Sequence, residues 1–115
     1  MTERDDASLS IRINLANGGR FGPGKAALLR AIRDGGSIRA AATTLGMSYP
    51  RALKLIDEMN ADFREPLVAS TVGGSDRGGS ALSETGKAVL AAYDEACRLA
   101  DTAAETILEQ LSSMQ

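Results

Sequence analysis

The stretch SIRAAATTLGMSYP, residues 37–50, decides the fold of this 115-residue chain. Ser37 is a favourable N-cap, and the alanine-rich residues after it predict a short helix. Gly46 permits a tight turn, Ser48 is again an N-cap, and Pro50 fits the first turn of the next helix. The small residues at the expected helix crossing are Ala41, Ala42 and Ala52. The pattern is typical of a helix-turn-helix, although any tight pair of helices could produce it.

The rest of the chain predicts a mainly α fold with a small β element. Apolar and polar residues alternate over 9–15, which indicates a half-exposed strand. In chain order we expect this strand, helices over 25–33, 38–45 and 48–63, a strand over 67–72, a return strand at 81–82 and a last helix over 83–111. The chain thus predicts a helix-turn-helix, then a hairpin, then a long C-terminal helix.

The composition excludes several classes of protein. With no His and one Cys, the chain can form neither a disulfide framework nor a Cys/His zinc site, and it lacks the commonest general base. No apolar run approaches the roughly 20 residues of a membrane span, and no signal peptide opens the chain. We therefore expect a cytoplasmic protein with a reduced Cys97 and with no metal or cofactor.

Charge is distributed unevenly along the chain. The net charge of −2 argues mildly against a nucleic-acid partner. However, residues 20–82 carry nine basic and six acidic residues, whereas residues 83–115 carry two basic and six acidic ones. An acidic end thus masks a basic middle, and such asymmetry indicates a charged partner.

Residues 19–26, GRFGPGKA, resemble the phosphate-binding loop of nucleotide hydrolases. Ala26 stands where a hydroxyl would hold Mg²⁺, and Pro23 removes one amide from the cradle. The alternating strand before the loop also differs from the parallel strands of nucleotide-binding sheets, which are buried on both faces. We interpret the segment as a glycine-rich turn, and an enzyme that uses Lys25 is the weakest of the alternatives.

The helix after Ser48 has a core face and an outer face. At 100° per residue, the core face consists of Ala52, Leu55, Ile56, Met59 and Phe63. The first two turns carry Arg51 and Lys54 outward, and the acidic residues come later. A recognition helix contacts base edges through its N-terminal residues, where the amides also favour phosphate. The helix therefore predicts DNA binding, although a solvated face with Lys54 paired to Glu58 would have the same pattern.

Residues 73–80, GGSDRGGS, predict the tip of a hairpin. Glycine allows the backbone to approach a phosphate closely, and Arg77 could reach into a minor groove. A mobile loop would have a similar sequence.

Residues 37–50 resemble the winged helix of LysR-type proteins, and a wider set of segments resembles the N-terminal domain of ModE-type molybdate-responsive regulators. That set consists of residues 22–25, 46–49, 57–60, 66–68, 73–74, 78–79 and 82–86. The resemblance implies a dimeric winged helix-turn-helix transcription factor. It reads DNA with Ser48, Tyr49 and the helix after them, while the wing, the hairpin of residues 67–82, contacts the DNA backbone. Ser75 stands where family members commonly carry Lys. A molybdate-binding domain follows in the family; we expect none in this chain, and no binding of molybdate.

The last helix carries an unbroken apolar seam of the kind that a coiled-coil partner requires. The residues expected at this dimer interface are Leu90, Tyr93, Cys97, Ala100, Ala104, Ile107 and Leu111. Its first two turns are expected to pack on their own domain.

These patterns predict a transcriptional regulator that binds specific double-stranded DNA as a homodimer and is not an enzyme. We expect a disordered N-terminus over 1–8, a DNA-binding domain over 9–86 and a dimerisation helix over 87–115. The residues expected to contact DNA are Ser37, Arg39, Ser48, Tyr49, Pro50, Arg51, Lys54, Gly74, Ser75, Arg77 and Gly78. A separate effector-sensing protein is a further possible partner. The alternative is a winged-helix protein–protein adaptor that does not bind DNA.

Overall fold

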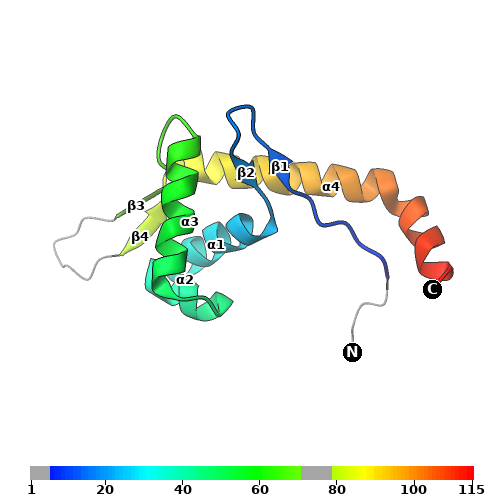
Figure 1. The fold of residues 1–115 in the computed structure, drawn as a ribbon, viewed down its shortest axis with the longest axis horizontal. Helices are drawn as coiled ribbons and strands as arrows, with labels where there is room; N and C mark the ends of the chain where they lie inside the picture. Colours follow the sequence, from blue (N-terminus) through cyan, green and yellow to red (C-terminus); the bar gives the residue numbers. More distant parts are fainter. Residues whose placement is uncertain (1–5, 71–78) are drawn as a thin grey trace.

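The structure is a computed structural model that describes residues 6–70 and 79–115. In chain order its elements are β1 (Ile13–Asn14), β2 (Arg20–Phe21), α1 (Pro23–Gly35), α2 (Ile38–Leu45), α3 (Tyr49–Asp62), β3 (Val68–Ser70), β4 (Ser80–Leu82) and α4 (Glu84–Ser113). The strands form two antiparallel pairs, β1 with β2 and β3 with β4. Figure 1 shows the three shorter helices gathered at one end of the long helix α4. The predicted fold class, a mainly α winged helix with a long C-terminal helix, is confirmed.

Helices α2 and α3 form the predicted helix-turn-helix. The Ser37 hydroxyl accepts a hydrogen bond from the Ala40 amide at 2.9 Å, and the Ser48 hydroxyl accepts one from the Arg51 amide at 3.2 Å. Gly46 ends α2 with a φ of 71°, a left-handed conformation that side chains rarely adopt. Both ends of the turn are therefore determined by the local residues that predicted it.

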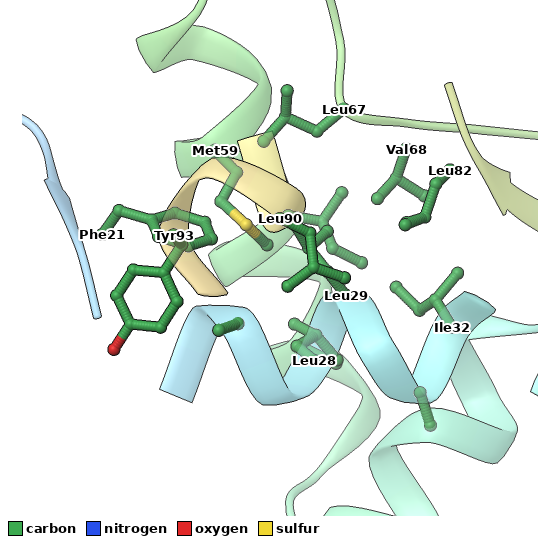
Figure 2. Packing of buried hydrophobic residues seen from close by; sticks show 14 of the residues in the cluster. Phe21, Leu28, Leu29, Ile32, Met59, Leu67, Val68, Leu82, Leu90 and Tyr93 are labelled. Carbon is green, nitrogen blue, oxygen red and sulfur yellow. The ribbon is translucent and has the colours of Figure 1, made fainter. Parts of the chain in front are cut away.

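One apolar core joins α1, the helix-turn-helix, the β3–β4 hairpin and the beginning of α4 (Figure 2). Its largest fully buried side chains are Leu28, Leu29, Ile32, Met59 and Leu67. The core is mostly aliphatic, as the low aromatic content of the sequence requires. Phe21 and Tyr93 form its single aromatic pair within the described residues, edge to face with ring centroids 5.2 Å apart.

Helix α4 contains 30 residues, and only its first part packs on this core. Gly86, Leu90 and Tyr93 are buried, whereas the later turns extend away from the body (Figure 1). Ile107 is 58% exposed. At about 1.5 Å per residue, a helix of this length spans roughly 45 Å. This helix accounts for most of the molecule's longest dimension, which is 56 Å.

The first strand is shorter than the alternating pattern predicts. Only Ile13 and Asn14 pair, with Phe21 and Arg20 respectively. The partner strand cannot continue, because Pro23 begins α1 two residues after Phe21 and has no amide to donate. The sequence did not predict β2, since its residues belong to the segment interpreted as a glycine-rich turn.

Several helix boundaries also differ by one or two residues from those predicted. Helix α1 spans Pro23–Gly35 rather than 25–33, and α4 continues to Ser113. Of the expected disordered terminus, residues 1–5 lie outside the described part of the chain. Residues 6–8 lie against the last turns of α4, where the Ala7 amide donates to the Ser112 hydroxyl at 2.7 Å. In the part of the chain that the structure describes, no helix is long and apolar enough to cross a membrane.

Candidate nucleic-acid interface

A stacked pair of side chains joins the two helices of the helix-turn-helix. The Arg39 guanidinium of α2 lies 4.1 Å from the centre of the Tyr49 ring, at the first residue of α3. A cation over an aromatic face is stabilised by about 0.5–1 kcal/mol at an exposed site. The contact orients Tyr49 and keeps a positive charge beside the beginning of α3.

The N-terminal turn of α3 is exposed and carries positive charge. Pro50, Arg51 and Lys54 are exposed, and Tyr49 is half-buried under Arg39. The Ser48 hydroxyl oxygen caps the helix, which leaves its hydrogen available to donate to a ligand. The structure thus brings together seven of the predicted contact residues in one region, because Ser37 caps the adjacent α2.

The carboxylates further along α3 do not neutralise this turn. Glu58 pairs with Lys25 of α1, with the carboxylate oxygen 3.3 Å from the ammonium nitrogen. Within the described residues, Lys54 forms no ion pair, so the alternative of a Lys54–Glu58 pair on a solvated face is not observed. The cations of the first two turns remain directed outward.

Lys25 has a structural task rather than the phosphate-binding one of a nucleotide loop. Its side chain is only 14% exposed. Its ammonium donates to the carbonyl of Arg20 at 2.8 Å, in addition to the ion pair with Glu58. These contacts hold the turn before α1 against β2 and α3, as the interpretation of a glycine-rich turn expects.

The base of the wing is anchored by a residue that the sequence analysis did not single out. The Asn60 side chain on α3 accepts hydrogen bonds from the Leu67 and Val68 amides at 2.8 and 3.3 Å. It also donates to the Val68 carbonyl at 3.4 Å. On the other strand, the Ser80 amide donates to the Gly36 carbonyl at the end of α1. An Asn within a helix carries no signal of such a role, because only the tertiary contact creates it.

The predicted wing contacts Gly74, Ser75, Arg77 and Gly78 lie outside the described residues. The two strands that lead to them are described and pair in register, Val68 with Leu82 and Ser70 with Ser80.

The predicted seam of α4 divides into two parts. Leu90 and Tyr93 are 3% and 5% exposed, because they pack into the core of their own domain, so the seam offered to a partner begins later than predicted. Cys97, Ala100 and Ala104 are half-buried. Ile107 and Leu111 are exposed. Leu99 is 54% exposed as well, but it lies roughly a third of a turn away from this seam.

A capped helix-turn-helix, a hairpin anchored directly after it and a long helix beyond define the chain as a winged helix-turn-helix protein. No family model matches the chain. It is similar to the molybdenum-pterin-binding protein MopB of Rhodobacter capsulatus, with 41% identity over 66% of this chain and 28% of the relative.

It is also similar to the transcriptional regulator ModE of Yersinia pestis, with 34% identity over 74% of this chain and 32% of the relative. The DNA-binding transcriptional dual regulator ModE of Escherichia coli K12 shows 36% identity over 63% of this chain and 28% of the relative. The chain thus spans about a quarter to a third of the length of these relatives. These matches confirm the predicted resemblance to the N-terminal domain of ModE-type regulators.

Proposed function

We propose that this chain is a cytoplasmic, sequence-specific double-stranded DNA-binding protein that regulates transcription. The observation that carries the proposal is the pair of N-terminal turns of α3, which are capped and carry exposed cations. Their two cations, Arg51 and Lys54, come before the first carboxylate of the helix. An arginine or lysine at this position of a recognition helix can reach the base edges of a major groove. The relatives named as transcriptional regulators support this function.

The proposed contacts follow from the position of each residue. Ser48, Tyr49, Arg51 and Lys54 read the DNA, while Ser37, Arg39 and Pro50 flank them on the same surface. Gly74, Ser75, Arg77 and Gly78 of the wing contact backbone or minor groove. We assign DNA binding to residues 9–86 and dimerisation to residues 87–115.

We propose a second copy of the chain as the partner of α4. The later turns of this helix expose Ile107 and Leu111, which lie about 40° apart around the helix axis and are 58% and 49% exposed. Ala100 and Ala104 on the same face allow two helices to approach closely, and the face continues well beyond the body of the domain. A two-fold pair of this kind would present two recognition helices to one duplex.

We also propose that DNA binding by these 115 residues needs no molybdate. An oxyanion is held by converging amides or cations in a closed pocket. The sequence after Leu82 instead carries six carboxylates against Lys87 and Arg98. The chain would then either bind DNA constitutively or receive its signal through a separate effector-sensing protein.

Selection of bound sequences from a random pool of duplexes tests the proposed function, followed by affinity measurement with alanine variants. Arg51→Ala and Lys54→Ala should each weaken binding to the selected site by about 1–3 kcal/mol if they contact bases. Lys87→Ala is the matched control, because this lysine lies on α4 and pairs with Glu84.

The adaptor alternative makes the opposite prediction for the same experiment. A protein–protein adaptor would enrich no sequence from the pool and would show no salt-dependent shift of random duplex DNA. If sequences are enriched but both alanine variants bind them as tightly as wild type does, α3 is not the reading element.

A further inference from the structure

An open pocket of about 650 Å³ lies between the β1–β2 hairpin, the beginning of α1 and one flank of α3. Four cationic residues line it, together with the carboxylates of Glu58 and Asp62. The cations are Arg12, Arg20, Lys25 and Arg51. Of these, only Arg51 belongs to the proposed reading surface, so the pocket has no role so far.

The charges in this pocket do not cancel. Lys25 and Glu58 neutralise each other, which leaves three arginines and a single carboxylate, Asp62. Among the residues described, Arg12, Arg20 and Arg51 form no ion pair, and all three are exposed. The pocket is therefore basic in a chain whose net charge is −2.

Arg12 lies against the turn that begins α1. A Cβ atom on Gly22 would come within 3.3 Å of the Arg12 Cγ atom, so the arginine stem packs on a backbone that has no side chain. This packing places the guanidinium of a β-hairpin residue beside the helix start. The packing also explains why Gly22 is a glycine, so no bound nucleotide is needed to account for this residue.

The pocket and the wing lie on opposite sides of α3. Arg51 lines the pocket, whereas Asn60 holds the base of the wing. Nine residues separate them, which at 100° per residue places them half a turn apart around the helix axis. Figure 1 shows the same arrangement, with α3 between the β3–β4 hairpin and the β1–β2 hairpin. The outer face with Lys54 lies between the two flanks.

We propose that this pocket binds backbone phosphates of the DNA strand on the side of α3 opposite the wing. The inference rests on the proposed function, because it needs the first turn of α3 to enter a major groove. The edges of that groove are phosphate backbones, and a guanidinium matches phosphate geometry with two parallel hydrogen bonds. Arg12 and Arg20 thus extend the contact surface from the helix to the β1–β2 hairpin.

A nucleotide is the other conceivable occupant, since residues 19–26 resemble a phosphate-binding loop. The position of Lys25 disfavours it. The ammonium of that lysine donates to the Arg20 carbonyl and pairs with Glu58, so it is not directed at a ligand. The free-nucleotide case therefore becomes an outcome of the test.

The test measures affinity for the selected duplex and for a random duplex as a function of salt, with the full chain. Each of Arg12→Ala and Arg20→Ala should lower the slope of log affinity against log salt by about 0.9 for every protomer bound, because each substitution removes one phosphate contact per protomer. Both substitutions should lower the affinity for the selected duplex and for the random duplex by the same factor, because phosphate contacts carry no sequence information. The backbone contact of Arg20 with Lys25 is retained in its alanine variant.

Two further variants make the result specific. Arg98→Ala is the matched control, because Arg98 is an exposed arginine on α4 that pairs with Glu95. The salt slope of this variant should equal that of the wild type. Arg20→Lys keeps the charge and should restore most of the slope.

Different results separate this inference from the proposed function. If wild type binds DNA and Arg12→Ala/Arg20→Ala keeps its salt slope, the pocket does not contact phosphate, while the proposed function stands. If the wild-type protein binds no duplex, both the proposed function and the phosphate-binding role of the pocket are wrong. Saturable calorimetric heat with a nucleoside triphosphate that the double variant loses would overturn the inference in favour of a nucleotide site.

Discussion

At the scale of single residues, Gly86 shows how closely two elements can approach. A Cβ atom at this position of α4 would lie 2.2 Å from the Leu67 carbonyl oxygen, which is backbone and cannot move aside. Gly86→Ala should therefore lower the free energy of unfolding by about 1–3 kcal/mol, the usual cost of overpacking a core. Urea denaturation measures this change.

The matched control at this scale is Gly24→Ala. Gly24 also lies in the first turn of a helix, and a Cβ atom there would meet nothing within 4 Å. Alanine in place of a helical glycine typically stabilises by about 0.4–1 kcal/mol. If the two variants are equally stable, α4 does not approach the Leu67 carbonyl as closely as the structure indicates.

At the scale of elements, Tyr93 connects α4 to the segment before β1. Its hydroxyl donates to the Ile11 carbonyl at 2.6 Å, and its ring contacts Phe21 of β2 edge to face. Burial, with a smaller contribution from the neighbouring Cys97, raises the pKa of Tyr93 to about 12 from its ordinary value of 10.0. The folded chain thus favours the neutral phenol.

Stability should consequently fall in alkaline solution. The unfolded chain releases this proton near pH 10.0, whereas the folded chain holds it to about pH 12, so the stabilisation is complete below pH 10 and is lost across that interval. Urea denaturation at a series of pH values should show this loss in wild type and not in Tyr93→Phe. Tyrosinate absorbance of Tyr49→Phe should follow Tyr93 alone and rise near pH 12. A rise near pH 10 would contradict the burial of the Tyr93 side chain.

At the scale of the whole molecule, the exposed face of α4 predicts assembly. Ile107→Glu places like charges opposite each other in a two-fold helix pair, so light scattering should detect monomers while circular dichroism stays that of the wild type. Ala91→Glu is the control: Ala91 is exposed, and the 16-residue separation places it nearly opposite Ile107 around the helix.

The same assembly determines the DNA site. A two-fold dimer places its recognition helices about 10 base pairs apart or a multiple of this, so the selected sequence should be palindromic. A wild-type chain that remains monomeric at micromolar concentration, or a selected site without symmetry, would contradict the dimer.

The sequence alone predicted the helix-turn-helix because its signals are local. Ser37, Ser48 and Gly46 act within a few residues of their own position, through capping hydrogen bonds and a left-handed backbone. Periodicity likewise predicted the core face of α3. The resemblance to ModE-type regulators rests on short segments of this same kind.

Only the tertiary structure decided which residues meet across the chain. It paired Glu58 with Lys25 rather than with Lys54. It also extended the part of α4 that packs on its own domain beyond the expected first two turns, to Tyr93. It also brought Arg12 to the flank of α3, 39 residues before Arg51 in the sequence. The physical reason is that caps and turns are satisfied by neighbouring atoms, whereas ion pairs, burial and pockets depend on how the elements pack.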